Sequence, residues 1–260
     1  MLRGMWSAAS GMAAQQMTID VIANNLANVN TTSFKKSRPE FQDLMYQTLS
    51  QAGSVTEEGG QIPTGIAIGM GTMPVGVQKQ FMQGDFKETK NQMDIAIEGK
   101  GFFRVISNNE ELYTRAGNFK LDTDGNIVTP NGERLQPGFT VPTDTVSISI
   151  DKLGTITVFD PSGAGTSLGV MELYNFTNPS GLYSLGHNLY RPTDASGEAI
   201  VGAPGSDGMG TLAQGFLEIS NVDVVEEMVS MIMAQRAYEI NSKSIQTADS
   251  MLQIANNIKR

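Results

Sequence analysis

The sequence contains no cysteine and only one histidine in 260 residues. The absence of cysteine excludes disulfides, thiolate catalysis and cysteine-ligated metal sites. A metal centre would have to use oxygen ligands alone, or be built around the imidazole of His187. The only candidate loop, residues 122–126, has its glycine at the wrong position for a calcium loop and lacks the final glutamate. We therefore expect no metal and no other cofactor.

Proline and glycine are missing from most of both ends of the chain. All ten prolines lie between Pro39 and Pro204, and residues 216–260 contain neither proline nor glycine. The first 38 residues have no proline and only Gly4 and Gly11. Because proline and glycine are the residues that most often break helices, both ends are predicted to be long helices. The middle is predicted to be strands and turns, which gives an α+β fold.

Long apolar runs are also missing. No stretch of 18 apolar residues occurs, so no transmembrane helix and no membrane insertion are expected. Ser7, Ser10, Gln15 and Gln16 interrupt the N-terminal apolar residues, so a cleaved signal peptide is not expected. These observations leave a cytoplasmic protein, or a protein exported by a route that does not read such a signal.

Charge is distributed unevenly. The net charge of −9 falls within residues 51–220, whereas the two ends together are neutral. Neutral ends can pack densely and an acidic middle stays solvated. The negative sign disfavours nucleic-acid binding.

The N-terminal segment has an apolar repeat with a period of seven. A second row, offset by three residues, contains small and apolar side chains with one polar exception. Such rows are typical of coiled-coil packing, and the polar residues after position 27 are expected to end the helix. The first row consists of Met5, Met12, Ile19 and Leu26, and the second of Ala8, Gln15, Ile22 and Val29.

The C-terminal segment repeats this pattern. A row of small residues lies three positions after the main row, and it would allow a second helix to approach closely. Ser220 or Asn221 is the expected N-cap, followed by acidic residues at the positive helix end. The main row is Val224, Met231, Tyr238, Ile245 and Leu252, and the small row is Ala234, Ala248 and Ala255.

The two helices are predicted to pair with each other in a coiled-coil-like inner domain, with residues 1–45 at one end of the chain and 218–260 at the other. Methionine and alanine dominate the packing rows, and such faces adapt to several neighbours. We therefore expect the main-row residues to lie in subunit interfaces as well. Ordinary core helices within one molecule are the alternative. Trp6, beside Met5, is expected at an interface.

Residues 46–78 alternate Gly, Thr, Val and Ile with helix and strand breakers, which predicts a long extended insertion with one or two short strands. A connector of this length without regular structure is unusual inside a compact domain. Ile66, Ile68 and Met70 alternate with small residues, so the segment is expected to contact a neighbouring subunit.

Residues 79–217 are predicted to form a central antiparallel β domain. Short runs of β-branched and aromatic residues are separated at close intervals by turn residues. Asp124-Gly125 and Asn131-Gly132 are expected hairpin turns. No constellation typical of catalysis occurs. The glycines at 65, 69, 71 and 76 fit no nucleotide-binding loop, and the acidic pairs at 57–58 and 110–111 read as solvated surface.

Three motifs resemble one known family. Residues 23–36, ANNLANVNTTSFKK, are similar to the N-terminal motif of the flagellar axial proteins, the rod and hook family, although that family often has glycine where this chain has Ser33. Residues 97–103 and 113–119 resemble the central β motif of the family, and residues 233–239 and 245–252 its C-terminal motif. The motif residues taken as functional are Asn24, Asn25, Leu26, Ala27, Asn28, Phe34, Arg236 and Tyr238.

The resemblance implies a structural subunit and no enzyme. Length, residues 46–78 and the C-terminal motif are most similar to the members that build the distal rod. The family implies export by the flagellar type III apparatus, a location in the basal body across the periplasm, and helical polymerisation into a hollow shaft that transmits torque. Expected partners are further copies of the chain, proximal rod subunits, hook or hook-adjacent subunits, the outer bushing rings and the export apparatus.

Two alternatives remain open at this point. One is another rod or hook subunit of the same family. The other is a secreted β-domain protein that binds a ligand or hydrolyses a substrate. Concentration-dependent polymerisation would favour an axial subunit, and a protease-resistant monomer would favour the secreted protein.

Overall fold

A computed structural model describes residues 2–53, 63–107, 109–206 and 208–258. The chain forms two compact units. The first, called the helical unit, comprises residues 1–27, 37–78 and 223–260. The second, called the β unit, comprises residues 28–36 and 79–222. Residues 28–36 thus group with the β strands, whereas the sequence placed them with the N-terminal helix.

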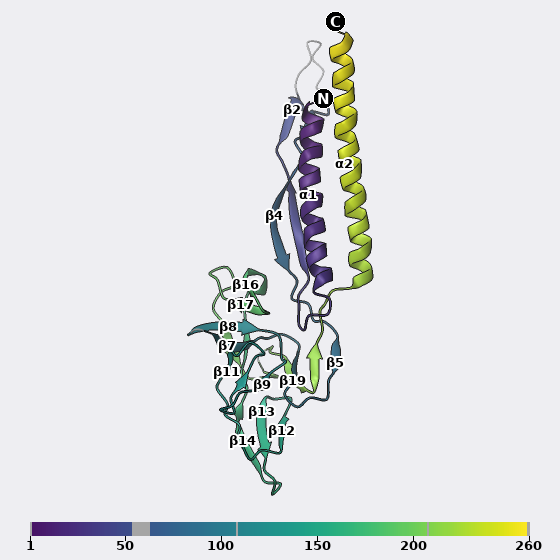
Figure 1. Cartoon of the computed structure of the whole chain (residues 1–260). Coiled ribbons are helices and arrows are strands. Elements are labelled where there is room, and N and C mark those ends of the chain that lie inside the picture. The colour runs from purple at the N-terminus through teal and green to yellow at the C-terminus, as the bar shows by residue number, and fades with distance from the viewer. Residues whose placement is uncertain (1, 54–62, 108, 207, 259–260) are drawn as a thin grey trace. The chain divides into compact units, whose positions relative to one another are not determined.

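Two long helices dominate the helical unit. Helix α1 spans Leu2–Ala27 and helix α2 spans Val224–Ile258. They lie side by side and run in opposite directions (Figure 1). Both helices form where the sequence lacks proline and nearly lacks glycine. Helix α1 ends where Thr31 N–H bonds back to the carbonyl of Asn28, as the run of Asn, Thr and Ser predicted. No helix in the described part of the chain is long and apolar enough to span a bilayer.

The N-cap of α2 differs from the expectation. The carboxylate of Asp223 accepts hydrogen bonds from the N–H groups of Val225 (2.8 Å) and Glu226 (3.1 Å), so Asp223 is the cap. The prediction that Ser220 or Asn221 is the N-cap of this helix was wrong. The Asn221 side chain is instead used within the β unit, where it accepts a hydrogen bond from Lys36 N–H.

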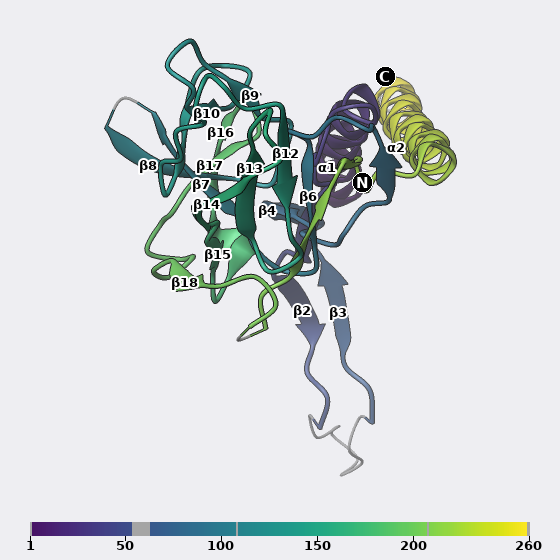
Figure 2. The same cartoon turned by 90° about the horizontal axis from the view of Figure 1, so that it is seen from below.

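Four strands accompany the helices in the helical unit. Strands β1 (Ser37–Asp43) and β4 (Thr72–Lys79) pair, and β2 (Tyr46–Ser50) pairs antiparallel with β3 (Ile66–Gly69). Figure 2 shows β2 and β3 side by side. Gly71 has φ +113°, and an added Cβ would meet the Ser10 hydroxyl of α1. Ser10 also accepts a hydrogen bond from Thr72 N–H (3.3 Å), which fixes β4 against α1.

Residues 46–78 therefore contain more regular structure than the sequence suggested. Nearly all of strand β4 lies in this segment, and β4 contacts helix α1 of the same chain. Residues 54–62, the centre of the expected extended insertion, lie outside the described residues.

The β unit contains an antiparallel sheet of seven strands in the order β16-β17-β8-β7-β11-β10-β9. A three-stranded sheet, β12-β13-β14, and the pairs β15-β18, β19-β6 and β20-β5 complete it. The bounds are β5 Phe86–Glu88, β6 Ile95–Glu98, β7 Phe103–Ser107, β8 Glu110–Thr114, β9 Lys120–Leu121, β10 Ile127–Val128, β11 Arg134–Gln136, β12 Ser147–Ile150, β13 Thr155–Phe159, β14 Gly165–Val170, β15 Leu173–Asn175, β16 Tyr183–Gly186, β17 Leu189–Arg191, β18 Ile200–Gly202, β19 Thr211–Gln214 and β20 Phe216–Glu218, with a 3₁₀ turn at Pro179–Gly181.

Two hydrophobic clusters form the core of the β unit. The larger joins aliphatic residues of β6, β12, β13 and β19 to Phe103 and Phe119, whose rings meet edge to face at 5.1 Å. The smaller is aromatic and contains Phe102, Tyr113 and Tyr174. These clusters make the β unit a folded body with its own core.

The α+β prediction is confirmed. The hairpin turns at Gly125 (φ +78°) and Gly132 (φ +92°) are also present, between β9 and β10 and between β10 and β11. The apolar run 211–218 forms two strands, β19 and β20, because Gly215 (φ +77°) interrupts it and donates its N–H to the carbonyl of Asp94. Strands β14 and β15 are likewise separated where Met171 N–H bonds to the carbonyl of Gly154.

Candidate functional site: a buried ion triad and exposed helix faces

The linker 28–36 is fixed inside the β unit by its backbone. Ser33 N–H donates to the carbonyl of Glu218 (2.8 Å), and the Ser33 hydroxyl donates to the carbonyl of Arg115 (3.0 Å). Ser33 has φ +55°, a conformation that glycine adopts most easily. The glycine that the rod and hook family often has at this position suits the same backbone. Asn188 adds a hydrogen bond to the carbonyl of Thr32 (3.2 Å).

A buried ion triad lies beside this linker. Lys35 Nζ is 2.7 Å from Glu218 Oε1, and Arg115 Nε is 2.8 Å from Glu218 Oε2. The three side chains are 1%, 7% and 1% exposed for Lys35, Arg115 and Glu218, respectively. Three charges so far from water are tolerated only when each is paired and hydrogen-bonded.

The remaining donors of the triad are satisfied by backbone. Arg115 donates to the carbonyls of Ile97, Gly99 and Gly101. Lys35 also donates to the carbonyl of Met82 (2.8 Å), and Glu218 Oε1 accepts from Gly84 N–H (2.9 Å). The triad therefore joins the linker, the chain at 82–84, the turn after β6 and strand β20.

Electrostatics favours an ionised Glu218. Burial alone would raise the pKa of Glu218, but Arg115 and Lys35 together hold it below its usual value. Burial lowers the pKa of the Lys35 ammonium, and the carboxylate of Glu218 opposes that shift. The carboxylate between two cations thus stabilises the β unit most when it is charged.

Asn221 makes a second polar junction in the same region. Its Oδ1 accepts from Lys36 N–H (2.7 Å), and its Nδ2 donates to the carbonyls of Gln80 (2.9 Å) and Met82 (3.2 Å). Phe34 is buried nearby under the Lys79 ammonium, which lies 5.0 Å from the ring centroid. The linker is thus held by hydrogen bonds, by the ion pair of Lys35 and by the cation–π contact of Phe34.

The helical unit has its own polar junction. Asn25 on α1 donates to Glu227 on α2 (3.0 Å), and both side chains are buried. Asn25 also exchanges two hydrogen bonds of 2.9 Å with the backbone of Ser37 at the start of β1. One asparagine therefore aligns both helices and the first strand.

The seam between the helices is lined by small residues. Ala8, Ala14 and Ile22 of α1 are buried, as are Ala234 and Ala248 of α2. An added Cβ on Gly11 would lie 3.0 Å from the Asn241 amide, so the helices approach closely there. These are largely the second and small rows of the sequence pattern.

The main-row residues flank this seam. Val224 and Tyr238 are exposed (39% and 38%). The others are half-buried: Met5, Met12, Ile19, Leu26, Met231, Ile245 and Leu252. A subunit interface at these positions is compatible with this exposure, and it stays a prediction.

A wide apolar face of α2 has no cover within the described chain. It comprises Val225, Met228, Val229, Ile232, Met233, Ile240, Met251 and Ile254, each between 46% and 71% exposed. On α1, Trp6 is 71% exposed and lines an apolar hollow of about 310 Å³ with Met5, Ala9 and Ile245. Patches of this size on a protein surface usually mark an interface.

The remaining predicted residues are dispersed. Ile66, Ile68 and Met70 are exposed at or next to β3. Asn24 and Ala27 are exposed and Asn28 is half-buried at the end of α1, while Arg236 pairs with Glu239 on the surface of α2. His187 lies in the β16–β17 turn, and no group of acidic, histidine or cysteine residues suited to a metal occurs among the described residues.

Sequence reasoning missed Lys35, Arg115, Glu218 and Glu227 as functional residues. Lys35 and Arg115 lie within the family motifs. A charged residue inside a motif that is predicted to be buried is unusual, and this could have identified both residues. Glu218 had no such signal, because only the fold brings it between them.

Comparison with known proteins identifies three matching regions. The model described as "Flagella basal body rod protein" matches residues 5–35, that of the "Flagellar hook protein FlgE/F/G D1 domain" residues 96–158, and that of the "Flagellar basal body rod FlgEFG protein C-terminal" residues 213–258. Together these regions contain Lys35, Arg115 and Glu218.

Whole-chain relatives extend this similarity. The "Flagellar basal-body rod protein FlgG" of Borreliella burgdorferi is 49% identical over 264 residues, with all of both chains covered. That of Caulobacter vibrioides is 45% identical over 99% of this chain and 100% of its own, and that of Bacillus subtilis is 41% identical over the full length of both.

Proposed function

Because the chain belongs to the flagellar basal-body rod and hook family, we propose that it is a structural subunit of the distal rod of the bacterial flagellum. The subunits polymerise helically into a rigid, hollow drive shaft that transmits motor torque to the hook. Its work is mechanical, and it turns over no substrate.

The observation that carries this proposal is the uncovered apolar face of α2. Eight apolar side chains on one helix stand at least 46% exposed, although α1 already covers another face of the same helix. Burying such side chains contributes about 25 cal/mol per Å² of apolar surface. A helix with apolar residues on two faces therefore favours association with further copies.

In the assembled shaft, helix pairs of many subunits form the inner layer and the β units form the outer layer. Ile66, Ile68 and Met70 contact a neighbouring subunit and stiffen the shaft. Proximal rod subunits and hook subunits bind the two ends of the polymer, and bushing rings surround it. The subunits reach the periplasm through the flagellar export apparatus.

A pair of substitutions on α2 tests the proposal. Ile232→Asp places a charge on the uncovered apolar face, where Ile232 is 56% exposed. Gln235→Asp adds the same charge at an exposed polar position of the same helix. Sedimentation velocity over a range of concentrations should show polymers for the wild type and Gln235→Asp, and monomers for Ile232→Asp. Equal polymerisation of the two variants would refute a role for this face.

A further inference from the structure

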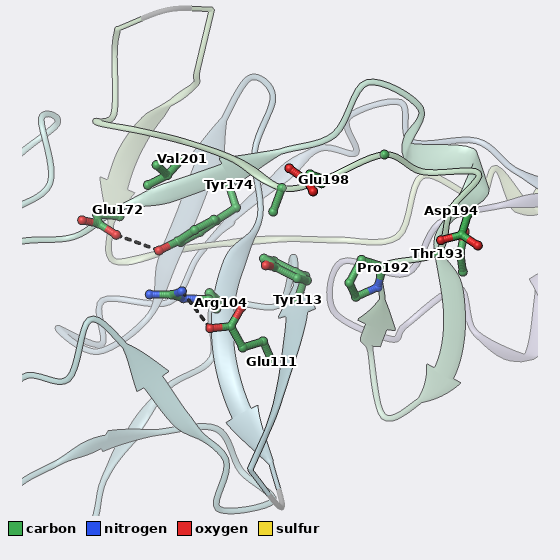
Figure 3. Close-up of a pocket in the computed structure, with 12 residues that line it drawn as sticks. Arg104, Glu111, Tyr113, Glu172, Tyr174, Pro192, Thr193, Asp194, Glu198 and Val201 are labelled. Atoms are coloured by element: carbon green, nitrogen blue, oxygen red, sulfur yellow. Dashed lines mark hydrogen bonds and ion pairs between the residues drawn. The ribbon is translucent and has the colours of Figure 1, made fainter.

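Two cavities of the β unit carry opposite charge. One, of about 900 Å³, is shown in Figure 3: its carboxylates lie apart from one another, and its cation, Arg104, pairs with Glu111 at 3.0 Å. It presents no converging set of groups to a ligand. The other, of about 170 Å³, is lined by three cations, Lys35, Lys100 and Arg115, and by no carboxylate of the described chain. This second cavity is called the cationic cavity.

The ion triad leaves the wall of the cationic cavity with excess positive charge. Lys35 and Arg115 are only 1% and 7% exposed, and they share the single carboxylate of Glu218. Two cations and one carboxylate leave one buried positive charge without compensation. Lys100 adds a further charge, because its ammonium makes no hydrogen bond or ion pair in the described chain. An anion in the cavity would offset this excess.

The donors of the two buried cations give a second, independent observation. An ammonium has three N–H donors and a guanidinium has five. Lys35 uses two donors, on Glu218 and on the carbonyl of Met82, and Arg115 uses at most four, on Glu218 and on backbone carbonyls. Each side chain therefore retains one N–H without an acceptor among the described residues, and both side chains line the cavity. Buried donors are normally paired, so these two mark the place of a ligand with two acceptor oxygens.

Aromatic side chains shape the rest of the cationic cavity. Phe81, Phe102 and Phe176 line it, and the ring of Phe102 meets the other two rings edge to face at 5.4 and 5.7 Å. Phe102 and Phe176 are each only 3% exposed, so their packing holds these walls in place. The small volume and the apolar walls suit a ligand with a short apolar chain behind its charged group.

We propose that the cationic cavity binds a carboxylate that carries a short apolar chain. The carboxylate oxygens accept hydrogen bonds from the remaining N–H groups of Lys35 and Arg115, and the exposed Lys100 pairs with the same anion. The phenylalanine rings contact the alkyl chain. Such a group occurs in small free carboxylic acids and in the glutamate side chain of a neighbouring protein chain. The site goes beyond the proposed function, because it is formed within a single β unit.

An NMR titration of the isotope-labelled full-length chain, at concentrations below those that give polymers, tests this site. The probes are butyrate, the peptide acetyl-Gly-Glu-Gly-amide, inorganic phosphate and the uncharged butyramide. Lys100→Gln removes one cation of the cavity and leaves the ion triad intact. The matched control is Lys120→Gln, which removes an exposed lysine of β9 that also has no partner in the described chain. Lys35→Met removes one of the buried donors.

At least one of the two carboxylates should bind the wild type and Lys120→Gln alike, and should shift the amide resonances of Lys100 and Gly101 in the cavity wall. Lys100→Gln should bind it about threefold more weakly, as expected for an exposed ion pair. Lys35→Met should bind it about tenfold more weakly, because a buried hydrogen bond to a charged group is lost. Butyramide should not bind.

Tighter binding of butyrate assigns the site to free carboxylic acids, and tighter binding of the peptide assigns it to a glutamate side chain. Absence of binding by both carboxylates, or equal affinity in Lys100→Gln and Lys120→Gln, would overturn the proposal. So would tighter binding of phosphate than of either carboxylate, or resonance shifts confined to residues outside the cavity. The comparison of the two exposed lysines decides the matter even if Lys35→Met unfolds. Because unpolymerised subunits are titrated, failure of this site is distinguishable from failure to polymerise.

Discussion

Removal of the Glu218 carboxylate tests whether the ion triad holds the linker in the β unit. Glu218→Gln keeps the side-chain shape and leaves Lys35 and Arg115 buried without a counterion. Breaking a buried ion pair costs about 3–5 kcal/mol, because a charge remains without compensation. A domain of this size loses about 2–4 °C in melting temperature per kcal/mol. The β unit should therefore melt about 6–20 °C lower.

The matched control is Glu88→Gln on β5, the strand that pairs with β20. The Glu88 side chain is exposed and makes no hydrogen bond or ion pair in the described chain, so replacing its carboxylate should cost less than about 0.5 kcal/mol. The melting temperature of Lys35→Met should lie between those of the two variants, because Glu218 keeps its ion pair with Arg115 and its hydrogen bond from Gly84 N–H. Differential scanning calorimetry measures the stability, and hydrogen exchange shows whether residues 28–36 lose protection first. A melting temperature of Glu218→Gln within 1–2 °C of that of Glu88→Gln, which corresponds to about 0.5 kcal/mol, would refute the reasoning. Unchanged hydrogen-exchange protection of the linker would refute it as well.

Four further results are expected. Because the pKa of Glu218 is lowered in the folded state, its carboxylate stabilises the β unit above the unfolded pKa of about 4.3, and this stabilisation is lost as pH falls through the folded pKa. The free energy of unfolding should therefore depend less steeply on acid pH in Glu218→Gln than in the wild type. Parallel curves would contradict this. Ile245→Asp places a charge beside the helix seam, and negative-stain images should show folded β units but no rods; normal rods would place the interface elsewhere. Deletion of residues 53–73 removes β3 and the first two residues of β4, and it should leave the β-unit melting temperature unchanged while polymers become bent or fail to form. Straight rods would reduce the segment to a spacer. After mild proteolysis of dilute protein, the helices should be trimmed and native mass spectrometry should find the peptide 28–36 still bound to the β core; a freely released linker would argue against the triad.

The sequence was informative where one rule decides local structure. Both helices could be predicted because proline and glycine are absent there, and the hairpins at 125 and 132 because each turn pairs a short polar residue with glycine. The strands around Gly215 were harder, since only the tertiary hydrogen bond to Asp94 shows that one apolar run divides into two strands.

The polar junctions could not be predicted for the same reason. Asn221 resembled a helix cap in the sequence, but its amide is used by Lys36, Gln80 and Met82, which are distant along the chain. Glu218 likewise gains its role from Lys35 and Arg115, residues 183 and 103 positions away. Pairing across such separations depends on topology, which periodicity alone does not encode.

The proposed role as a shaft subunit is tested most directly by electron microscopy of the concentrated full-length protein. Straight, hollow rods of uniform diameter, absent from the Ile232→Asp variant, are the result expected from the uncovered face of α2. Dispersed monomers at every concentration, with both helices intact and resistant to protease, would contradict it.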